Sequence, residues 1–116
     1  MRTMNIRHTF SALSVTAALQ CFAPAAWAGS AAFERGLDAL NDYRYTLALM
    51  HFKQAAEQGD PEAQRNLGLM LFYGSKLYGP DVQSNHEQAR NWFELAARQG
   101  CEVSSMMLKL MAQQPH

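Results

Sequence analysis

The chain repeats itself at an offset of 41 residues, and this self-similarity constrains its fold more than any other feature. Residues 48–59 (ALMHFKQAAEQG) and 89–100 (ARNWFELAARQG) share six of twelve positions. The same register continues beyond these segments at three further pairs: Ala63 with Ser104, Leu67 with Leu108, and Met70 with Met111. A fixed period of this length is typical of repeat architectures, whose units bury their apolar faces only by stacking on their neighbours.

The spacing of the apolar residues identifies the repeated unit as helical. Four residues of the first segment lie at i, i+4, i+7 and i+8, on one face of an α-helix: Ala48, Phe52, Ala55 and Ala56. Gly59 and Gly100 follow their helices at the position where a positive φ ends a helix. Asp60 and Pro61 then suit the N-cap and the first position of the next helix.

The pattern as a whole predicts an all-α fold of about five helices and no strand. The expected ranges are 30–41, 44–58, 61–73, 85–99 and 102–113. A capping-box spacing over 84–87 marks the start of the fourth helix. The longest connection, 74–83, contains Gly79-Pro80 and therefore is not helical throughout.

The first 28 residues have the composition of a secretory signal peptide. They contain two arginines and no acid, and a short apolar stretch over 10–23 is interrupted by polar residues. Ala26-Trp27-Ala28 supplies an A-x-A site for cleavage between Ala28 and Gly29. An uncleaved anchor is the alternative, whereas Gln20 before Cys21 argues against a lipoprotein site. Cleavage leaves a domain over 29–116 that is periplasmic or secreted and no longer attached to a membrane.

Composition excludes several classes of function. A length of 116 residues suffices for one small domain. Ten basic residues against ten acidic ones leave no positive excess for binding nucleic acid. At 48% hydrophobic and 17% charged residues, the chain is also too apolar to be disordered.

Cys101 is the one cysteine that remains after the expected cleavage. It lies at the expected N-cap of the last helix, where the positive end of the helix favours the thiolate. We therefore treat Cys101 as a candidate reactive thiol that would form a mixed disulfide or link two copies in an oxidising compartment. The alternative is a small, half-buried residue at a tight turn.

No spacing in the chain indicates a metal or catalytic site. His51, His86 and His116 lack the i, i+4 or short-loop spacing of metal ligands. Neither a phosphate-binding loop nor a nucleophile elbow occurs. We expect no cofactor, no metal and no enzymatic activity; a pocket that holds His51 or His86 beside a carboxylate would favour an enzyme instead.

Two stretches carry a family consensus. The first includes residues 55–60 (AAEQGD) and 66–68 (NLG), and the second is 89–100. Both resemble the Sel-1-like repeat, a branch of the tetratricopeptide-like proteins. The resemblance implies a short right-handed α/α solenoid with repeat 1 over about 31–60, repeat 2 over about 61–100 and a capping helix over about 102–113. Lys109 departs from the pattern, which has a close-packing glycine at this position.

The resemblance also implies a binding surface, because the first helix of each pair lines the concave wall in such stacks. Counting from Leu67-Gly68 as packing positions places five residues on that wall: Arg65, Asn66, Leu69, Phe72 and Tyr73. An Arg–Asn pair beside apolar side chains would hold a peptide. The alternative is that Leu69 and Phe72 only pack between helices.

The last helix carries a second apolar stripe, which is a candidate homodimer surface. Its members are Met106, Met107, Leu110 and Met111. Taken together, these features predict an exported adaptor that binds another protein or a peptide on its concave face. A small secreted enzyme or an enzyme-regulating factor is the alternative.

Overall fold

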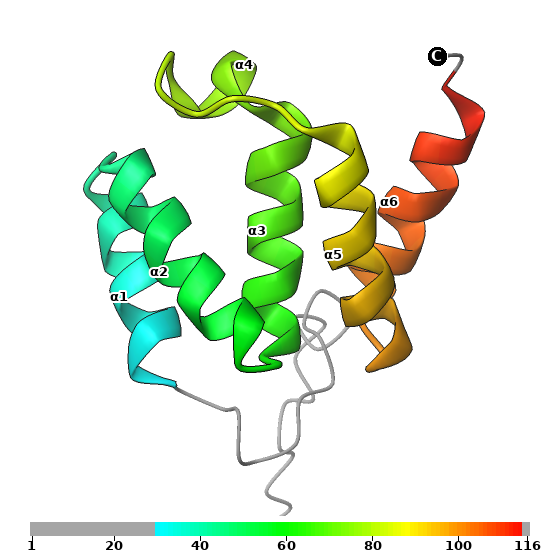
Figure 1. Ribbon diagram of the computed structural model, residues 1–116, viewed down its shortest axis with the longest axis horizontal. Helices are drawn as coiled ribbons and strands as arrows, with labels where there is room; N and C mark the ends of the chain where they lie inside the picture. Colours follow the sequence, from blue (N-terminus) through cyan, green and yellow to red (C-terminus); the bar gives the residue numbers. More distant parts are fainter. Residues whose placement is uncertain (1–29, 115–116) are drawn as a thin grey trace, which may run out of the picture.

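The five longer helices follow one another in chain order, each running opposite to the long helix before it, as the computed structural model shows for residues 30–114 (Figure 1). The described residues contain six helices and no strand: α1 (Ala31–Asn41), α2 (Tyr45–Glu57), α3 (Pro61–Tyr73), α4 (Ser75–Tyr78), α5 (His86–Arg98) and α6 (Glu102–Gln113). The all-α prediction is confirmed, and the five expected helices begin and end within one residue of the observed bounds. The short α4 was not expected.

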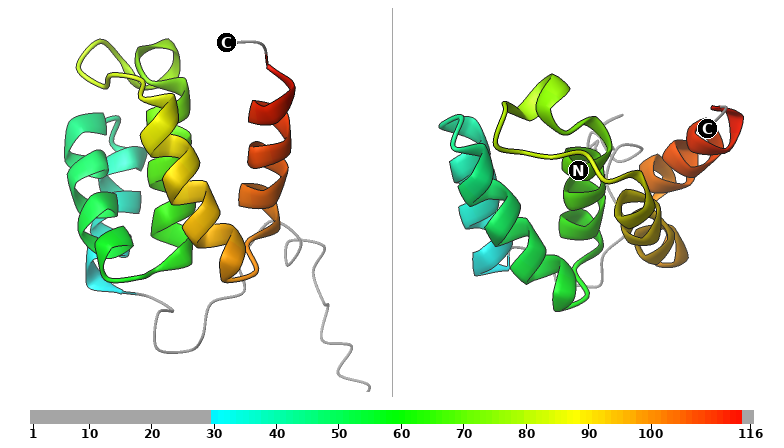
Figure 2. Two further views of the ribbon diagram at one scale, coloured as in Figure 1. Left: turned by 45° about the vertical axis from the view of Figure 1, so that its right-hand side comes forward. Right: turned by 45° about the horizontal axis from the view of Figure 1, so that its top comes forward.

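The packing is that of an α/α solenoid. The main contacts join α1 with α2, α2 with α3, α3 with α5, and α5 with α6. Two antiparallel pairs, α1–α2 and α3–α5, therefore stack side by side, and α6 closes the row behind α5 (Figure 2). Small residues make this close stacking feasible, because Ala48, Ala55 and Ala89 are fully buried at the helix contacts.

Each pair is joined by a glycine that meets a phenylalanine. A Cβ atom on Gly36 would lie 2.6 Å from the Phe52 ring, and one on Gly68 would lie 2.6 Å from the Phe93 ring. Both phenylalanines are fully buried. The glycine and the ring thus form one repeated contact, which sets the distance between the two helices of each pair.

Buried polar groups connect the ends of the helices. Asp60, 1% exposed, caps α3 by accepting the backbone N–H groups of Glu62 and Ala63 at 3.0 and 3.3 Å, as predicted. Its second oxygen accepts the Ser30 hydroxyl at 3.1 Å, which ties the start of α1 to that of α3. Glycines end two of the helices as expected, because φ is 97° at Gly59 and 89° at Gly100.

A second polar contact joins the two repeats. The Gln99 amide donates to the Gly59 carbonyl and to the Gln64 side-chain oxygen, both at 3.0 Å. Gln64, which is buried, in turn donates to the Ala56 carbonyl at 3.2 Å. Since Gln99 follows α5 while Ala56 belongs to α2, these bonds hold the ends of three neighbouring helices at fixed positions.

The long connection after α3 is folded onto the helices. Val82 is fully buried in the main core, and the Asn85 N–H donates to the Leu71 carbonyl at 2.7 Å. Gly74 ends α3 at φ +52°, and a Cβ there would collide with the backbone of Ser84. Asn85 caps α5 by accepting the Gln88 N–H at 3.0 Å, so the cap lies one residue beyond the expected Ser84.

Several predictions concern residues that the structure does not describe. The signal peptide over 1–28, its cleavage site between Ala28 and Gly29, and His116 lie outside the described residues. Within 30–114, no helix is both long and apolar enough to cross a membrane.

Candidate functional site

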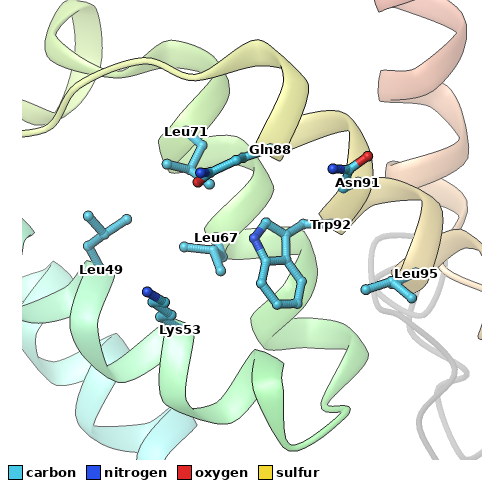
Figure 3. A pocket seen from close by; sticks show the side chains of 8 residues that line it. All are labelled: Leu49, Lys53, Leu67, Leu71, Gln88, Asn91, Trp92 and Leu95. Carbon is cyan, nitrogen blue, oxygen red and sulfur yellow. The ribbon is translucent and has the colours of Figure 1, made fainter.

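A groove with a volume of about 410 Å³ runs over α3, between α2 and α5 (Figure 3). Its floor is formed by Leu67 and Leu71, which are 2% and 9% exposed. Both point to the same side of α3 because they are four residues apart. The floor is therefore an apolar surface held rigidly by the main core.

The walls come from the two neighbouring helices. Leu49 and Lys53, one turn apart on α2, form one wall. The other wall is a stripe on α5 at i, i+3, i+4 and i+7: Gln88, Asn91, Trp92 and Leu95. Trp92 is half-buried beside Leu67, and Leu95 is 40% exposed, so the α5 wall presents two large apolar side chains at the surface (Figure 3).

The groove carries a single charged side chain, which is a lysine. Lys53 is the one ionisable side chain that lines it, and Gln88 and Asn91 add neutral amides. No carboxylate, histidine, serine or cysteine lies among the lining residues, so the groove lacks a carboxylate–histidine pair and a hydroxyl or thiol nucleophile. Its chemistry suits the binding of an apolar segment, with amides and one cation to orient it.

The predicted concave wall lies on a different face of α3. Leu69 is two residues from Leu67, and two residues correspond to a turn of about 200° around the helix. Leu69 is half-buried against the core, and Asn66 has a buried Nδ2 without a hydrogen-bond partner among the described residues. Arg65 is in an ion pair with Glu62, at 3.3 Å.

Phe72 does not line an open surface, contrary to expectation. It is 9% exposed and stacks on the His86 ring at a centroid distance of 5.0 Å, with 19° between the planes. Tyr73 meets it edge-on at 4.9 Å and is itself half-buried. Phe72 thus joins the end of α3 to the start of α5. Binding of a partner by Arg65, Asn66, Leu69 and Tyr73 stays a prediction.

The exposed thiol expected at Cys101 is wrong, because Cys101 is fully buried. Its sulfur accepts the Ser104 hydroxyl at 3.3 Å. The other cysteine of the sequence, Cys21, lies outside the described residues. The residue is at the N-cap of α6, as predicted, but its side chain turns inward and packs with Ala96 and Val103.

His51 and His86 lie outside the groove. His51 has a buried Nδ1 with no hydrogen-bond partner in the described part of the chain. Across residues 30–114, no group of three or more histidine, cysteine or carboxylate side chains is placed to hold a metal ion.

The stripe on α6 is divided between core and surface. Met107 and Met111 are buried, whereas Met106 and Leu110 are 67% and 41% exposed. The two exposed side chains lie on α6, the last helix of the row, which makes its main contacts with α5. Homodimerisation through this end stays a prediction.

The groove was not predicted from the sequence, although one pattern in α5 indicates it. The stripe of Gln88, Asn91, Trp92 and Leu95 follows the helical period on a face distinct from the core positions Ala89 and Phe93. A tryptophan and a leucine on a second face of a helix indicate a further contact surface. The partner wall on α2 has no comparable signal, because Leu49 and Lys53 follow no apolar stripe of their own.

The arrangement defines the protein class: an α/α repeat protein with a surface groove between neighbouring units. The family model of the Sel1 repeat matches the chain twice, over residues 23–60 and 61–101. These matches cover more than half of the 116 residues, so the chain belongs to the Sel1 repeat family, and the expected family is confirmed. Repeats of this kind generally mediate protein–protein interactions. No curated protein and no solved structure matches the chain at a significant level.

Proposed function

We propose that this protein is an exported adaptor that holds an apolar segment of a partner protein in the groove between α2 and α5. The observation that carries the proposal is the α5 wall, where Trp92 and Leu95 are presented at the surface over a buried leucine floor. Tryptophans beside a hydrophobic pocket are the side chains that most often dominate binding energy at protein interfaces.

The chemistry of the walls describes the segment that fits. Apolar side chains of the partner would replace water above Leu67 and Leu71, which supplies the favourable free energy. Lys53 favours an acidic group near the α2 wall, and the amides of Gln88 and Asn91 suit backbone groups of the partner. The expected ligand is therefore a short, mainly apolar segment with one carboxylate.

Binding through this groove is tested with two leucines that are similarly exposed. Leu95 lines the groove, while Leu77 on α4 is 57% exposed and lies outside it. Partners captured from a periplasmic extract by the native protein are identified by mass spectrometry and purified. Their affinities for the native protein, Leu95→Asp, Trp92→Ala and Leu77→Asp are then measured by calorimetry. We expect Trp92→Ala to weaken binding about 30-fold, as for a central interface residue, and Leu77→Asp to leave it unchanged.

The same purified partner separates the groove from the wall predicted at Leu69. Leu69→Asp serves as the competing variant because Leu69 points away from the groove floor. Circular dichroism first confirms that each variant keeps its helices. A loss of affinity in Leu69→Asp with full binding by Leu95→Asp and Trp92→Ala would reject the groove and support the other wall.

Export is the second part of the proposal, and it rests on the leader over 1–28. Expression of the full chain in a Gram-negative host should yield a periplasmic protein that begins at Gly29. Intact mass and N-terminal sequencing of the purified product measure this directly. A product that retains residues 1–28 and stays with the membrane fraction would indicate an anchor instead, and one in the cytoplasm would exclude export by this leader.

A further inference from the structure

A second hollow, with a volume of about 470 Å³, lies at the end of the molecule where α1 turns into α2. It shares no lining residue with the groove between α2 and α5. We call it the tyrosine cavity; its lining consists of residues 43–47 (YRYTL) and 78–81 (YGPD). In Figure 1 the connection after α4 lies near the start of α2, and these two segments supply most of the lining residues.

Three tyrosines form a continuous row in this cavity. The rings of Tyr43 and Tyr45 meet edge-to-face at a centroid distance of 6.2 Å and an angle of 86°. Tyr45 and Tyr78 meet in the same manner at 5.5 Å and 75°. Because neighbouring rings are nearly perpendicular, a ligand that lies along the row would contact the face of one ring and the edge of the next.

Tyr43 is held in an unfavourable backbone conformation at the outer end of this row. Its φ is +58°, and it is the one described non-glycine residue with a positive φ. Glycine or asparagine would adopt this conformation more readily. The ring is 77% exposed, with Tyr45 as its aromatic neighbour. Burial of the ring within the protein does not explain a strained tyrosine at this position, whereas contact with a ligand does.

The hydrogen-bonding groups around the row are mainly donors. Burial, followed by the nearby phenols of Tyr73 and Tyr45, raises the pKa of Tyr78, so its hydroxyl stays protonated and able to donate. Arg44 is exposed and in no ion pair within residues 30–114. Asp81, equally exposed and unpaired there, supplies one negative charge at the edge.

We propose that the tyrosine cavity is a second binding site, which takes a proline-rich segment of another protein in the polyproline II conformation. Proline rings pack well on aromatic faces, and the preformed helix loses little entropy on binding. Such a segment has many free carbonyl groups and few N–H groups, which matches the donors of Tyr78 and Arg44. A basic residue beside the prolines would pair with Asp81.

The dimensions of the row agree with this ligand. Its two successive ring-to-ring steps are 6.2 and 5.5 Å. One turn of a polyproline II helix contains three residues and rises about 9 Å. Slightly more than one turn therefore spans the row from Tyr43 to Tyr78 even if the row is straight, so a short motif is long enough to contact all three rings.

The test measures binding of a defined peptide by fluorescence anisotropy. The probe is a fluorescein-labelled peptide of ten prolines followed by one arginine, and the control probe replaces the prolines by alternating glycine and serine. The variants are Tyr43→Asn, which tolerates the positive φ, and Tyr78→Phe, which removes only the hydroxyl. Leu95→Asp in the groove is the matched control, because it lies outside the cavity.

We expect saturable binding of the proline probe, weakened at least tenfold in Tyr43→Asn and severalfold in Tyr78→Phe, and unchanged in Leu95→Asp. Absence of saturation at millimolar protein, or equal binding of the glycine–serine probe, overturns the proposal. Undiminished binding by a folded Tyr43→Asn variant overturns it as well. Displacement of the probe by an N-acetylglucosamine oligomer that itself binds more tightly would assign the cavity to a glycan. None of these results depends on a ligand in the groove.

Discussion

Replacing Phe93 by alanine is expected to lower the free energy of unfolding by about 4 kcal/mol. Phe93 is fully buried between α3 and α5, and its ring lies against Gly68, which has no side chain to move into the space left behind. The cavity therefore stays open, and the transfer free energy of the ring is lost with it. Urea denaturation followed by circular dichroism measures the change.

Leu95→Ala, on the same helix, provides the comparison for Phe93→Ala. Leu95 is 40% exposed and lines the groove, so its truncation should cost less than about 1 kcal/mol. Comparable losses in the two variants would show that α5 is not anchored to α3 through Phe93. A domain of this size has a total stability of about 5–15 kcal/mol, so the Phe93 variant should be close to unfolding at 37 °C.

The second large effect is expected for Gly68→Leu. A Cβ atom at this position would lie 2.6 Å from Phe93 Cε1, closer than two carbon atoms approach. The helices must separate to admit the side chain, at a cost of about 3 kcal/mol. Thermal unfolding followed at 222 nm, together with urea denaturation, gives the change in stability.

Lys109→Leu is the matched control for Gly68→Leu, because Lys109 occupies the corresponding position of α6 in the 41-residue register. Lys109 is exposed, and within residues 30–114 no further helix packs on α6 in the way that α5 packs on α3. Its replacement should change the stability by less than about 0.5 kcal/mol. A similar loss at both positions would mean that leucine is poorly tolerated for reasons other than the contact with Phe93.

The Phe93 contact also bears on function, because α5 carries both the core and the groove. Ala89 and Phe93 belong to the main core, with the Phe93 ring against Gly68 of α3, whereas Trp92 and Leu95 face the groove. A shift of α5 away from α3 would therefore move the groove wall relative to Leu49 and Lys53 on α2. We expect Gly68→Leu to weaken binding in the groove more than binding in the tyrosine cavity.

Two separate hollows are consistent with an adaptor. The groove takes its lining from α2, α3 and α5, and the tyrosine cavity takes its lining from the turn before α2, the start of α2 and the connection after α4. A chain with two such sites would bring an apolar segment and a proline-rich segment into one complex. The variants of Leu95 and Tyr43 test the two sites independently.

The helices themselves could be predicted because their signals are local. The i, i+4, i+7 spacing of Ala48, Phe52 and Ala55 marks a buried face regardless of which helix covers it. The ends of α2 and α5 follow from Gly59 and Gly100, whose positive φ is a property of single residues. The 41-residue register then indicates that the two units pack in the same way.

Cys101 could not be assigned correctly from its place in the chain. Its position at the start of α6 was predicted, and a thiol at an N-cap is a reasonable candidate for reactivity. The side chain is instead fully buried. Burial of a cap residue depends on how closely α6 approaches α5, which no local pattern reports.

The sequence alone determined the class of this protein and its five longer helices, because periodicity and caps act within a few residues. Only the tertiary structure decided which flank of α3 is open. Leu67 and Leu69 are both leucines on one helix, but only Leu67 lies on the side of α3 where α2 and α5 form the walls of a groove. That choice depends on the angles and distances between stacked helices, which are set by contacts such as Gly68 with Phe93 across 25 residues of chain.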